Sequence, residues 1–336
     1  MKYKLSAIAI LLICAIGASA QSTATINKPK LTASNPAVET PEKIDAKASS
    51  SQADWTKTWS VVVSLNTTFD SNLEHDVKPV RAAGLAPSIV AGYEVRSKRH
   101  RIRLISGLSG SRYTRSTDLN RVGQYLGASY RLSLGRWSWE TEGEAILKGT
   151  NDDRETNNQF IFTQKLGFRF DRKTRSQVYF AYRLKRYAPA NADRNSVNPM
   201  FGIKLSRRFG KKYEWDFGYR YDENRAVGQR QRYIRWTYDT DLKYQLTKKD
   251  LLKIGFSVRP RLYERTVRVG DVRVPRRDGK YSFDFVWQRQ INRNVGFEFN
   301  YGFEKQTSND QDKFYRDHQI GFSIFYHFGN GEIIEP

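Results

Sequence analysis

Large apolar and polar residues alternate along most of the chain. In Tyr213–Tyr221 the odd positions are aromatic and the even positions are polar or small, and Val295–Phe303 and Ile320–Phe328 follow a similar pattern. An alternation with period two over about nine residues predicts a β-strand with two unlike faces. Strands of soluble domains usually have about 5–6 residues, whereas a tilted strand that crosses a bilayer needs about 9–11. The pattern therefore predicts membrane-spanning strands.

Fourteen segments of this kind follow one another, and the connections between them alternate in length. The predicted strand cores are 57–69, 84–95, 101–113, 122–134, 136–147, 159–171, 177–187, 198–209, 212–222, 232–246, 251–264, 280–290, 294–304 and 317–328. The short connections are 96–99, 135, 171–175, 210–211, 247–250 and 292–293, and the longer ones are 70–83, 114–121, 148–158, 188–197, 223–231, 265–279 and 305–316. Short periplasmic turns and longer outer loops are typical of outer-membrane barrels.

Lipid offers no hydrogen-bond partners to the backbone, so a sheet of such strands has to close on itself. We therefore predict an all-β fold, a transmembrane antiparallel up-and-down β-barrel of about 14 strands over residues 55–328. The even strand number places both chain ends in the periplasm.

The N-terminal residues predict export. Lys2 and Lys4 precede an apolar run from Ala7 to Ile16, and Ala18-Ser19-Ala20 is a small-x-small cleavage site. We expect a signal peptide over 1–20 that is cleaved after Ala20, and a location in the cell outer membrane. Residues 21–54 have few large apolar side chains, which predicts a disordered periplasmic linker. Residues 329–336 are expected to form a periplasmic tail.

The formal net charge is +22. A basic balance of this size often indicates a nucleic-acid partner. The export signal argues against one, and nothing in the sequence resembles an RRM, a zinc finger or a helix-turn-helix. We therefore predict no nucleic-acid partner and expect many of the basic residues to lie inside the barrel.

Six of the seven tryptophans lie near the predicted periplasmic ends of strands. They are Trp55, Trp59, Trp137, Trp139, Trp215 and Trp287. Indole rings prefer the headgroup level of a bilayer, so these residues predict an inner aromatic girdle. The outer-membrane lipids, including lipopolysaccharide, are the partners expected for this surface.

Two segments resemble known outer-membrane proteins. The end of the last predicted strand, Phe325–Phe328, resembles the C-terminal signal of bacterial outer-membrane β-barrels of the porin-like superfamily. This resemblance implies recognition by the barrel-assembly machinery through Tyr326 and Phe328, although the chain here continues to Pro336. The segment Thr67–Leu73 is faintly similar to a turn in the barrels of surface lipoprotein assembly modifiers. Those modifiers carry helical repeats before the barrel, a pattern that this sequence does not show.

If the aromatic residues face lipid, the residues between them face the lumen, and many of these are charged. One interpretation is that Lys/Arg and Glu/Asp pair across strands and fill a closed lumen. The other is an open channel in which uncompensated basic residues attract anions. The sixth to eighth predicted strands favour a channel, because their inward residues include no acidic partner except Asp171 at the rim. The expected anion path consists of Arg103, Arg131, Lys165, Arg169, Arg183, Lys185, Lys204, Arg208, Arg259 and Arg261.

We therefore expect a porin-like outer-membrane channel for passive passage of small or polymeric acidic solutes. The alternative is a non-conducting or gated barrel for envelope or lipoprotein assembly or polysaccharide export. No catalytic residues and no cofactor are expected, because none of the four histidines has a serine and a carboxylate at a suggestive position. These histidines are His75, His100, His318 and His327. No metal site is expected either, since the acidic stretches 151–155 and 308–312 lack the spacing of an EF-hand loop.

Overall fold

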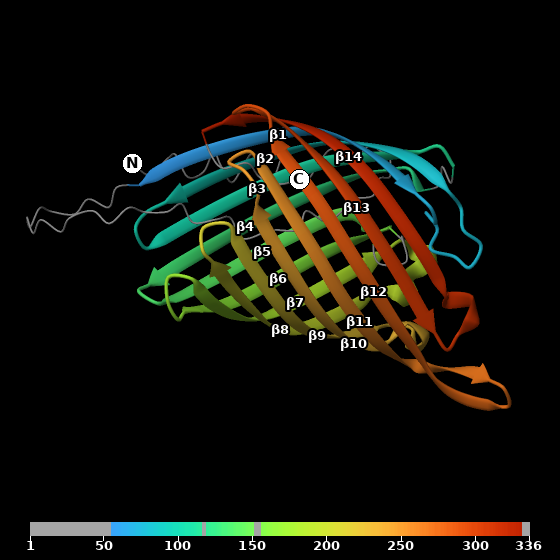
Figure 1. The fold of residues 1–336 in the computed structure, drawn as a ribbon. Helices are drawn as coiled ribbons and strands as arrows, with labels where there is room; N and C mark the ends of the chain where they lie inside the picture. The colour runs from blue at the N-terminus through green and yellow to red at the C-terminus, as the bar shows by residue number, and fades with distance from the viewer. Residues whose placement is uncertain (1–54, 116–118, 151–155, 331–336) are drawn as a thin grey trace, which may run out of the picture.

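The computed structural model describes residues 55–115, 119–150 and 156–330. Fourteen antiparallel strands in these residues form one closed barrel, in which each strand pairs with its neighbours in sequence and β1 pairs with β14 (Figure 1). The strands are β1 (Thr56–Asp70), β2 (Ala82–Arg96), β3 (His100–Tyr113), β4 (Arg121–Leu134), β5 (Trp137–Thr150), β6 (Thr156–Arg169), β7 (Thr174–Tyr187), β8 (Ser196–Phe209), β9 (Tyr213–Ala226), β10 (Tyr233–Gln245), β11 (Asp250–Val269), β12 (Val272–Gln290), β13 (Val295–Ser308) and β14 (Tyr315–Gly329). The predicted barrel and its strand number are confirmed.

The predicted signal peptide 1–20 and linker 21–54 lie outside the described residues, as do residues 331–336 of the predicted tail.

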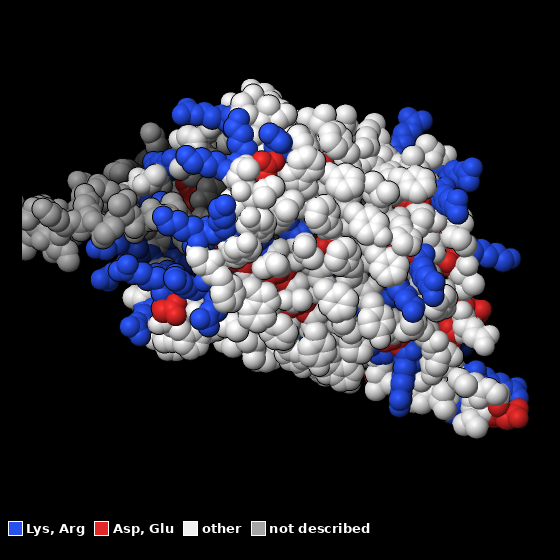
Figure 2. All heavy atoms as spheres, in the orientation of Figure 1, with Lys and Arg blue, Asp and Glu red and all other residues white. Residues whose placement is uncertain are grey.

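Each strand presents apolar side chains outward and mostly polar ones inward. On β1, Val63 and Leu65 are 42% and 48% exposed, whereas Ser60 and Ser64 are buried on the other face. The exposed side chains form a belt that is almost free of charge between two charged ends of the barrel (Figure 2). A belt of this kind matches the hydrocarbon layer of a bilayer, and the inward face forms the lumen.

Closure is completed by eleven register pairs between the first and the last strand, from Ser60 opposite Gly329 to Asp70 opposite Gln319. This pairing leaves the sheet without a free edge. In lipid an open edge would expose backbone N–H and C=O groups that have no alternative partner.

The two ends of the barrel differ in their connections. At the short-turn end, Gly135 begins the two-residue link from β4 to β5 with a φ of 62°, a left-handed conformation that suits glycine. At the long-loop end, the connections contain the short 3₁₀ helices η2 (Pro189–Arg194), η3 (Gln229–Gln231) and η4 (Gln311–Lys313). None of the helices in the described part of the chain is long and apolar enough to cross a membrane.

The prediction of a long loop at 265–279 is wrong. The structure has instead a hairpin, in which β11 and β12 extend beyond the barrel wall and turn at Gly270 (Figure 1). Val267 and Val269 pair there with Val274 and Val272, so β-branched residues support the extension. Closely spaced arginines and Pro275 obscured the alternation, and the register shifts between Leu262 and Thr266.

The six tryptophans expected in the girdle lie near the short-turn end. Trp59, Trp137 and Trp139 are 51%, 51% and 43% exposed there. Trp215 and Trp287 lie near the same ends of β9 and β12, each two or three residues from the strand terminus. Their positions agree with an aromatic girdle at one membrane surface.

An apolar cluster inside the barrel was not predicted. It takes one inward side chain from each of the strands β2 to β8, and all of them are buried. These residues are Val90, Ile105, Tyr125, Ile146, Ile161, Ala181 and Met200. The cluster fills part of the lumen on this side with mostly apolar side chains.

Closure and register can be tested with a disulfide across the β1–β14 pair. Leu65 and Ile324 are register partners, and partners in antiparallel strands have Cα atoms about 4.5–5.5 Å apart, within reach of a disulfide. We expect the double variant Leu65→Cys/Ile324→Cys to form an intramolecular disulfide on mild oxidation, seen as altered mobility on a non-reducing denaturing gel. Leu65→Cys/Ile320→Cys is the control, because an offset of four residues is about 13 Å. Equal cross-linking of both pairs would contradict the register.

Candidate channel lumen

Ion pairs between neighbouring strands hold the lumen wall near the short-turn end. Glu140 of β5 accepts hydrogen bonds from the guanidinium of Arg131 on β4 and from Lys165 Nζ on β6, the latter at 2.9 Å. Lys165 Nζ also lies 2.6 Å from Glu142 Oε2. The three strands are therefore linked by one network of two cations and two carboxylates.

A second network links β8, β9 and β10. Lys204 Nζ lies 3.5 Å from Asp216 Oδ2, and Arg208 Nε donates to Glu214 Oε2 at 2.9 Å. Lys243 of β10 lies between the same carboxylates, 3.7 Å from Glu214 and 3.4 Å from Asp216. Cross-strand ion pairs of this kind link neighbouring strands, and removing one partner leaves a charge without compensation.

These networks correct one expectation. The wall of β6–β8 was expected to lack acidic partners, and this is wrong for Lys165, Lys204 and Arg208. Their partners come from the flanking strands β5 and β9, which the closed sheet places directly beside them. Arg131 is paired in the same way.

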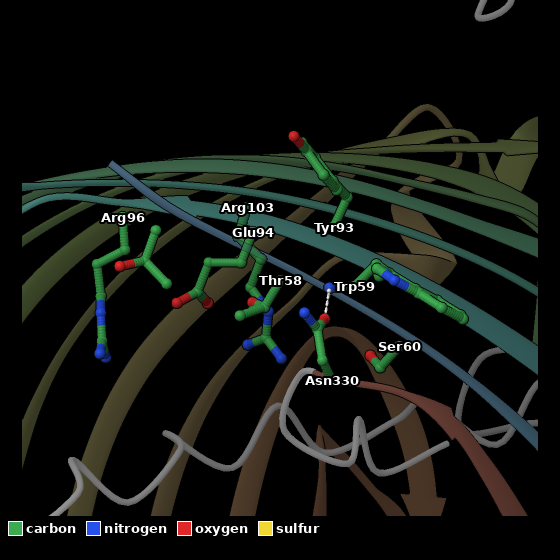
Figure 3. Close-up of a pocket in the computed structure, with 10 residues that line it drawn as sticks. Thr58, Trp59, Ser60, Tyr93, Glu94, Arg96, Arg103 and Asn330 are labelled. Atoms are coloured by element: carbon green, nitrogen blue, oxygen red, sulfur yellow. Dashed lines mark hydrogen bonds between the residues drawn. The ribbon is translucent and has the colours of Figure 1, made fainter. Parts of the chain in front are cut away.

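The remaining basic residues predicted for the anion path lie at different heights in the lumen. Arg103 is opposite Glu94 in register and lines a pocket of 140 Å³ at the short-turn mouth. Figure 3 shows Tyr93 on the other side of the strands from Glu94 and Arg103, and Asn330 accepting a hydrogen bond from the backbone N–H of Trp59 at 3.0 Å. Arg169 is exposed at the same end. Lys185, near the long-loop end, is buried.

Guanidinium groups gather in the half of the lumen nearer the long loops. Asp222 is 0% exposed, and its Oδ2 atom lies 2.9 Å from Arg235 Nε and 3.5 Å from Arg220 Nε. Arg183 of β7 interacts electrostatically with the same carboxylate and with both of these arginines. Within the described residues Arg183 forms no ion pair, and its Nε has no hydrogen-bond partner. Two arginines thus pair with one buried carboxylate, and Arg183 is a third cation near it.

Two arginines of β11 extend this group. Arg259 donates to the hydroxyls of Ser257 and Ser282 at 3.3 and 3.1 Å, and it has no ion pair in the part of the chain that the structure describes. Arg261 donates to the Tyr263 hydroxyl at 2.7 Å, and its guanidinium carbon lies 4.6 Å from the ring centroid of Tyr233. Aromatic faces stabilise a guanidinium without neutralising its charge.

We call Arg183, Arg220, Arg235, Arg259 and Arg261 the arginine cluster. The same stretch of wall also carries Asp222, Asp239 and Asp278, and Arg276 pairs with the last of these at 2.9 Å. Six guanidinium groups therefore share this wall with three carboxylates, which gives it a net positive charge.

Sequence reasoning missed Arg220, Arg235 and Arg276. The first two were within reach, because Arg220 stands between the outward Tyr219 and Tyr221, and Arg235 stands between Ile234 and Trp236. The alternation alone places both inward. Arg276 belongs to the hairpin that was taken for a loop.

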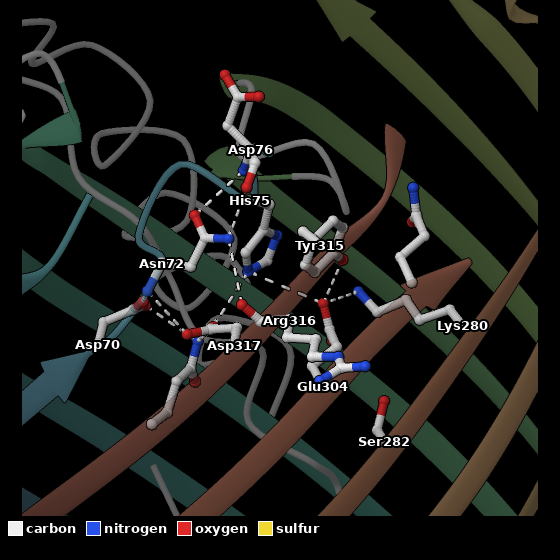
Figure 4. A network of polar contacts seen from close by, with 12 residues as sticks. Asp70, Asn72, His75, Asp76, Lys280, Ser282, Glu304, Tyr315, Arg316 and Asp317 are labelled. Carbon is white, nitrogen blue, oxygen red and sulfur yellow. Dashed lines mark hydrogen bonds and ion pairs between the residues drawn. The ribbon is translucent and has the colours of Figure 1, made fainter. Parts of the chain in front are cut away.

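The segment that resembles the assembly modifiers anchors the β1–β2 loop in the long-loop mouth (Figure 4). The backbone N–H of Asn72 donates to Asp70 Oδ1 at 2.9 Å and to Asp317 Oδ1 at 3.0 Å. The Asn72 amide donates to the carbonyl oxygens of Asp76 and Arg316 at 2.8 and 3.2 Å. Asn72 therefore connects the loop to the β1–β14 seam by hydrogen bonds.

His75 lies beyond this anchor, with a left-handed φ of 53°. Its ring stacks on Tyr315 with centroids 4.6 Å apart, and its Nε2 lies 3.4 Å from Asp317 Oδ2 and 3.8 Å from Glu304 Oε1. Lys280 Nζ lies 2.7 Å from the same Glu304 oxygen. The loop is thus held by ring stacking and close polar contacts to β13 and β14.

The other histidines lie apart from one another. His100 Nδ1 is 2.9 Å from the Tyr130 hydroxyl on the outer face, and His318 Nδ1 is 2.9 Å from the Tyr301 hydroxyl. His327 is buried on the inner face of β14. The described residues contain no group of three or more His, Cys, Asp or Glu side chains that could hold a metal ion, and the acidic stretch 151–155 is outside them.

Tyr326 and Phe328, the expected assembly signal, lie on the lipid-facing side of β14, where they are 41% and 45% exposed. They are opposite Val63 and Val61 of β1. The strand that carries the aromatic residues is thus the one that closes the barrel.

The fold is similar to that of solved porin-like barrels. An anion-selective porin from Comamonas acidovorans matches with a TM-score of 0.50 and 8% identity, covering 82% of this chain and 100% of that one. The outer-membrane-expressed OmpT of Vibrio cholerae matches with a TM-score of 0.50 and 10% identity, covering 84% and 100%. No family model and no curated protein matches the sequence. At these identities the likeness shows a shared barrel fold.

The lumen network around Glu140 should contribute to stability. We expect Glu140→Gln to lower the free energy of unfolding by about 1–2 kcal/mol, because Arg131 and Lys165 lose a charged partner in a site partly shielded from water. The exposed pair of Glu223 and Arg225 supplies the control, and Glu223→Gln should cost less than about 0.5 kcal/mol. Urea unfolding of the barrel in lipid vesicles measures both. Equal effects would show that the lumen pairs are as weak as surface pairs.

The anchor at Asn72 should keep the β1–β2 loop folded. In Asn72→Ala the side-chain hydrogen bonds to the loop and to β14 are lost, so we expect trypsin to cleave faster after Arg81 while the barrel stays intact. Val77→Ala, at an exposed position of the same loop, should leave the cleavage rate unchanged. The rate is measured by mass spectrometry of the fragments. An unchanged rate in Asn72→Ala would mean that other contacts hold the loop.

Proposed function

We propose that the protein is an outer-membrane channel that passes anionic solutes passively, with the arginine cluster as its selectivity region. The supporting observation is the excess of guanidinium groups over carboxylates on one wall of the lumen. Two cluster members, Arg183 and Arg259, have no ion pair within the described chain, so their charge is available to a passing anion. Uncompensated charge in a narrow lumen raises the local concentration of the opposite ion.

The proposal assigns only some of the basic residues predicted for the anion path to selectivity. Lys165, Lys204, Arg208 and Arg131 serve mainly to bind strands together, while Arg183, Arg259 and Arg261 belong to the proposed selectivity region. One protein of similar fold is an anion-selective porin, which is in line with this assignment. Acidic solutes, small or polymeric, are the class that such a wall favours.

Further parts of the proposal concern biogenesis. Export with cleavage after Ala20, recognition of Tyr326 and Phe328 by the barrel-assembly machinery, and contact with lipopolysaccharide follow from the sequence signals and from the lipid-facing belt. The proposed activity is transport without chemistry, so it requires neither an enzyme site nor a cofactor.

A second candidate is a gated or non-conducting barrel for envelope or lipoprotein assembly or polysaccharide export. It is favoured by the apolar cluster of β2–β8 and by the ion-pair networks, both of which fill the lumen. Conductance distinguishes the two functions, because a barrel with a filled lumen would insert into a bilayer without passing current.

The channel proposal can be tested by the reversal potential in a salt gradient across a planar bilayer. The wild-type protein should prefer anions, and the preference should weaken as salt screens the lumen charge. Arg183→Gln/Arg259→Gln should lower the ratio of anion to cation permeability by about threefold or more, because two charges leave the constricted wall.

The matched control is Arg183→Lys/Arg259→Lys, which keeps both charges and should keep most of the anion preference. If the Gln and Lys variants behave alike, shape and not charge sets the selectivity. If the wild-type protein inserts but never conducts, the second candidate replaces the first.

A further inference from the structure

A groove of 730 Å³ crosses the lipid-facing wall from β1 to β7. Its floor consists of small outward residues, and large apolar side chains border it. The floor residues are Ala91, Ser106, Ala128, Gly143 and Ala145, and the bordering residues include Trp59, Tyr93, Phe160, Phe162 and Tyr182. The bordering rings are 40% to 51% exposed, so they stand out from the wall.

The groove runs obliquely along the barrel. On β1 and β2 it begins at Trp59 and Tyr93, three residues from the strand ends at the short-turn end, and on β6 and β7 it reaches the half nearer the long loops. The groove follows two adjacent rows of register partners across these strands, so an apolar chain that lies in it spans part of the apolar belt. Apolar walls on both sides gain dispersion contacts only when a chain lies between them.

Cationic side chains lie beside the end of the groove that is nearer the short turns. Lys57 is on the same face of β1 as Trp59, two residues or about 7 Å nearer the short-turn end. Lys98 and Arg99 form the adjoining β2–β3 turn, and all three side chains are exposed. Between them and the apolar floor, His100 and Tyr130 join on the outer face at 2.9 Å. Apolar, aromatic and cationic side chains thus follow one another in the order that matches the acyl, interfacial and phosphate regions of a leaflet.

The basic turn belongs to a wider rim. All six short turns carry cations at exposed positions, and Figure 2 shows Lys and Arg gathered at this end of the barrel. These residues are Lys98, Arg99, Arg136, Arg172, Lys173, Lys211, Lys212, Lys248, Lys249 and Arg293. The acidic exception among the turn residues is Asp171, whose pKa is lowered by hydrogen bonds from the backbone N–H groups of Lys173 and Thr174. Only on the β1–β2 side does this rim adjoin the groove.

We propose that the groove and its adjoining cations form a binding site for one anionic phospholipid of the leaflet at the short-turn end. An acyl chain lies on the floor from Ala91 to Ala145, and the phosphate lies among Lys57, Lys98 and Arg99. The inference rests on the transmembrane fold and is independent of conduction.

A second copy of the chain fits this surface less well. Copies inserted in the same direction and related by a twofold axis would bring the same patch of each together. Lys57, Lys98 and Arg99 of one copy would then face their equivalents in the other, and like charges oppose that contact. An anionic headgroup neutralises the same residues.

The site can be tested by native mass spectrometry of the folded barrel released from detergent, with dioleoylphosphatidylglycerol as the probe and dioleoylphosphatidylcholine as the zwitterionic control. We expect one phosphatidylglycerol to be retained preferentially. Lys98→Gln/Arg99→Gln should weaken its binding about tenfold, because two of three phosphate contacts are lost. Lys211→Gln/Lys212→Gln, on the rim away from the groove, should change it less than about twofold.

The groove itself is tested by Ala128→Leu/Ala145→Leu, which fills the floor and should weaken phosphatidylglycerol binding to a similar degree. Ala83→Leu is the control, because Ala83 is exposed on the outer face of β2 away from the groove. A heat-induced mobility shift on gels confirms that each variant is folded.

Three results would overturn the proposal. Equal binding of the two lipids would remove the role of charge. Equal loss in both rim variants would indicate a uniform basic collar without a defined site. Unchanged lipid binding together with dissociation of an oligomer by the floor variants would make the groove an interface between copies.

Discussion

Backbone hydrogen bonding in a medium without water is the constraint on which this structure depends. Each strand crosses the apolar layer with its N–H and C=O groups directed sideways, so every strand needs two neighbours. The β1–β14 seam supplies the last of these contacts. With 14 antiparallel strands, closure also places both described chain ends at the same end of the barrel.

Closure also decides where charge can lie. Because the outer face has to be apolar, most charged side chains of the strands share the lumen, where partners on neighbouring strands lie within reach. Near the short turns this produces linked networks around Glu140 and Glu214. Near the long loops Arg220 and Arg235 pair with the buried Asp222, and Arg183 is a third cation near it. Placing charged side chains in the lumen thus produces two regions in the same barrel. One is linked by ion pairs, and the other carries a net positive charge.

Most of the fold could be predicted from the sequence, since alternation is a local signal. The first strand was expected at 57–69 and occupies Thr56–Asp70. The extended hairpin escaped prediction because its alternation is broken near Pro275. The partners of Lys165 and Lys204 escaped because register depends on how neighbouring strands align, which no single segment records. The apolar cluster in the lumen escaped for the same reason, since each strand contributes only one inward residue to it.

The seam between β1 and β14 has a consequence for how the chain folds. All other strand pairs join neighbours in sequence, whereas Asp70 and Gln319 in the seam are 249 positions apart. Closing so long a loop costs more conformational entropy than forming a hairpin between neighbouring strands. We therefore expect the seam to form after the hairpins, since it needs both the first and the last strand in place. A chain interrupted before β14 would keep two open strand edges, and open edges are templates for aggregation.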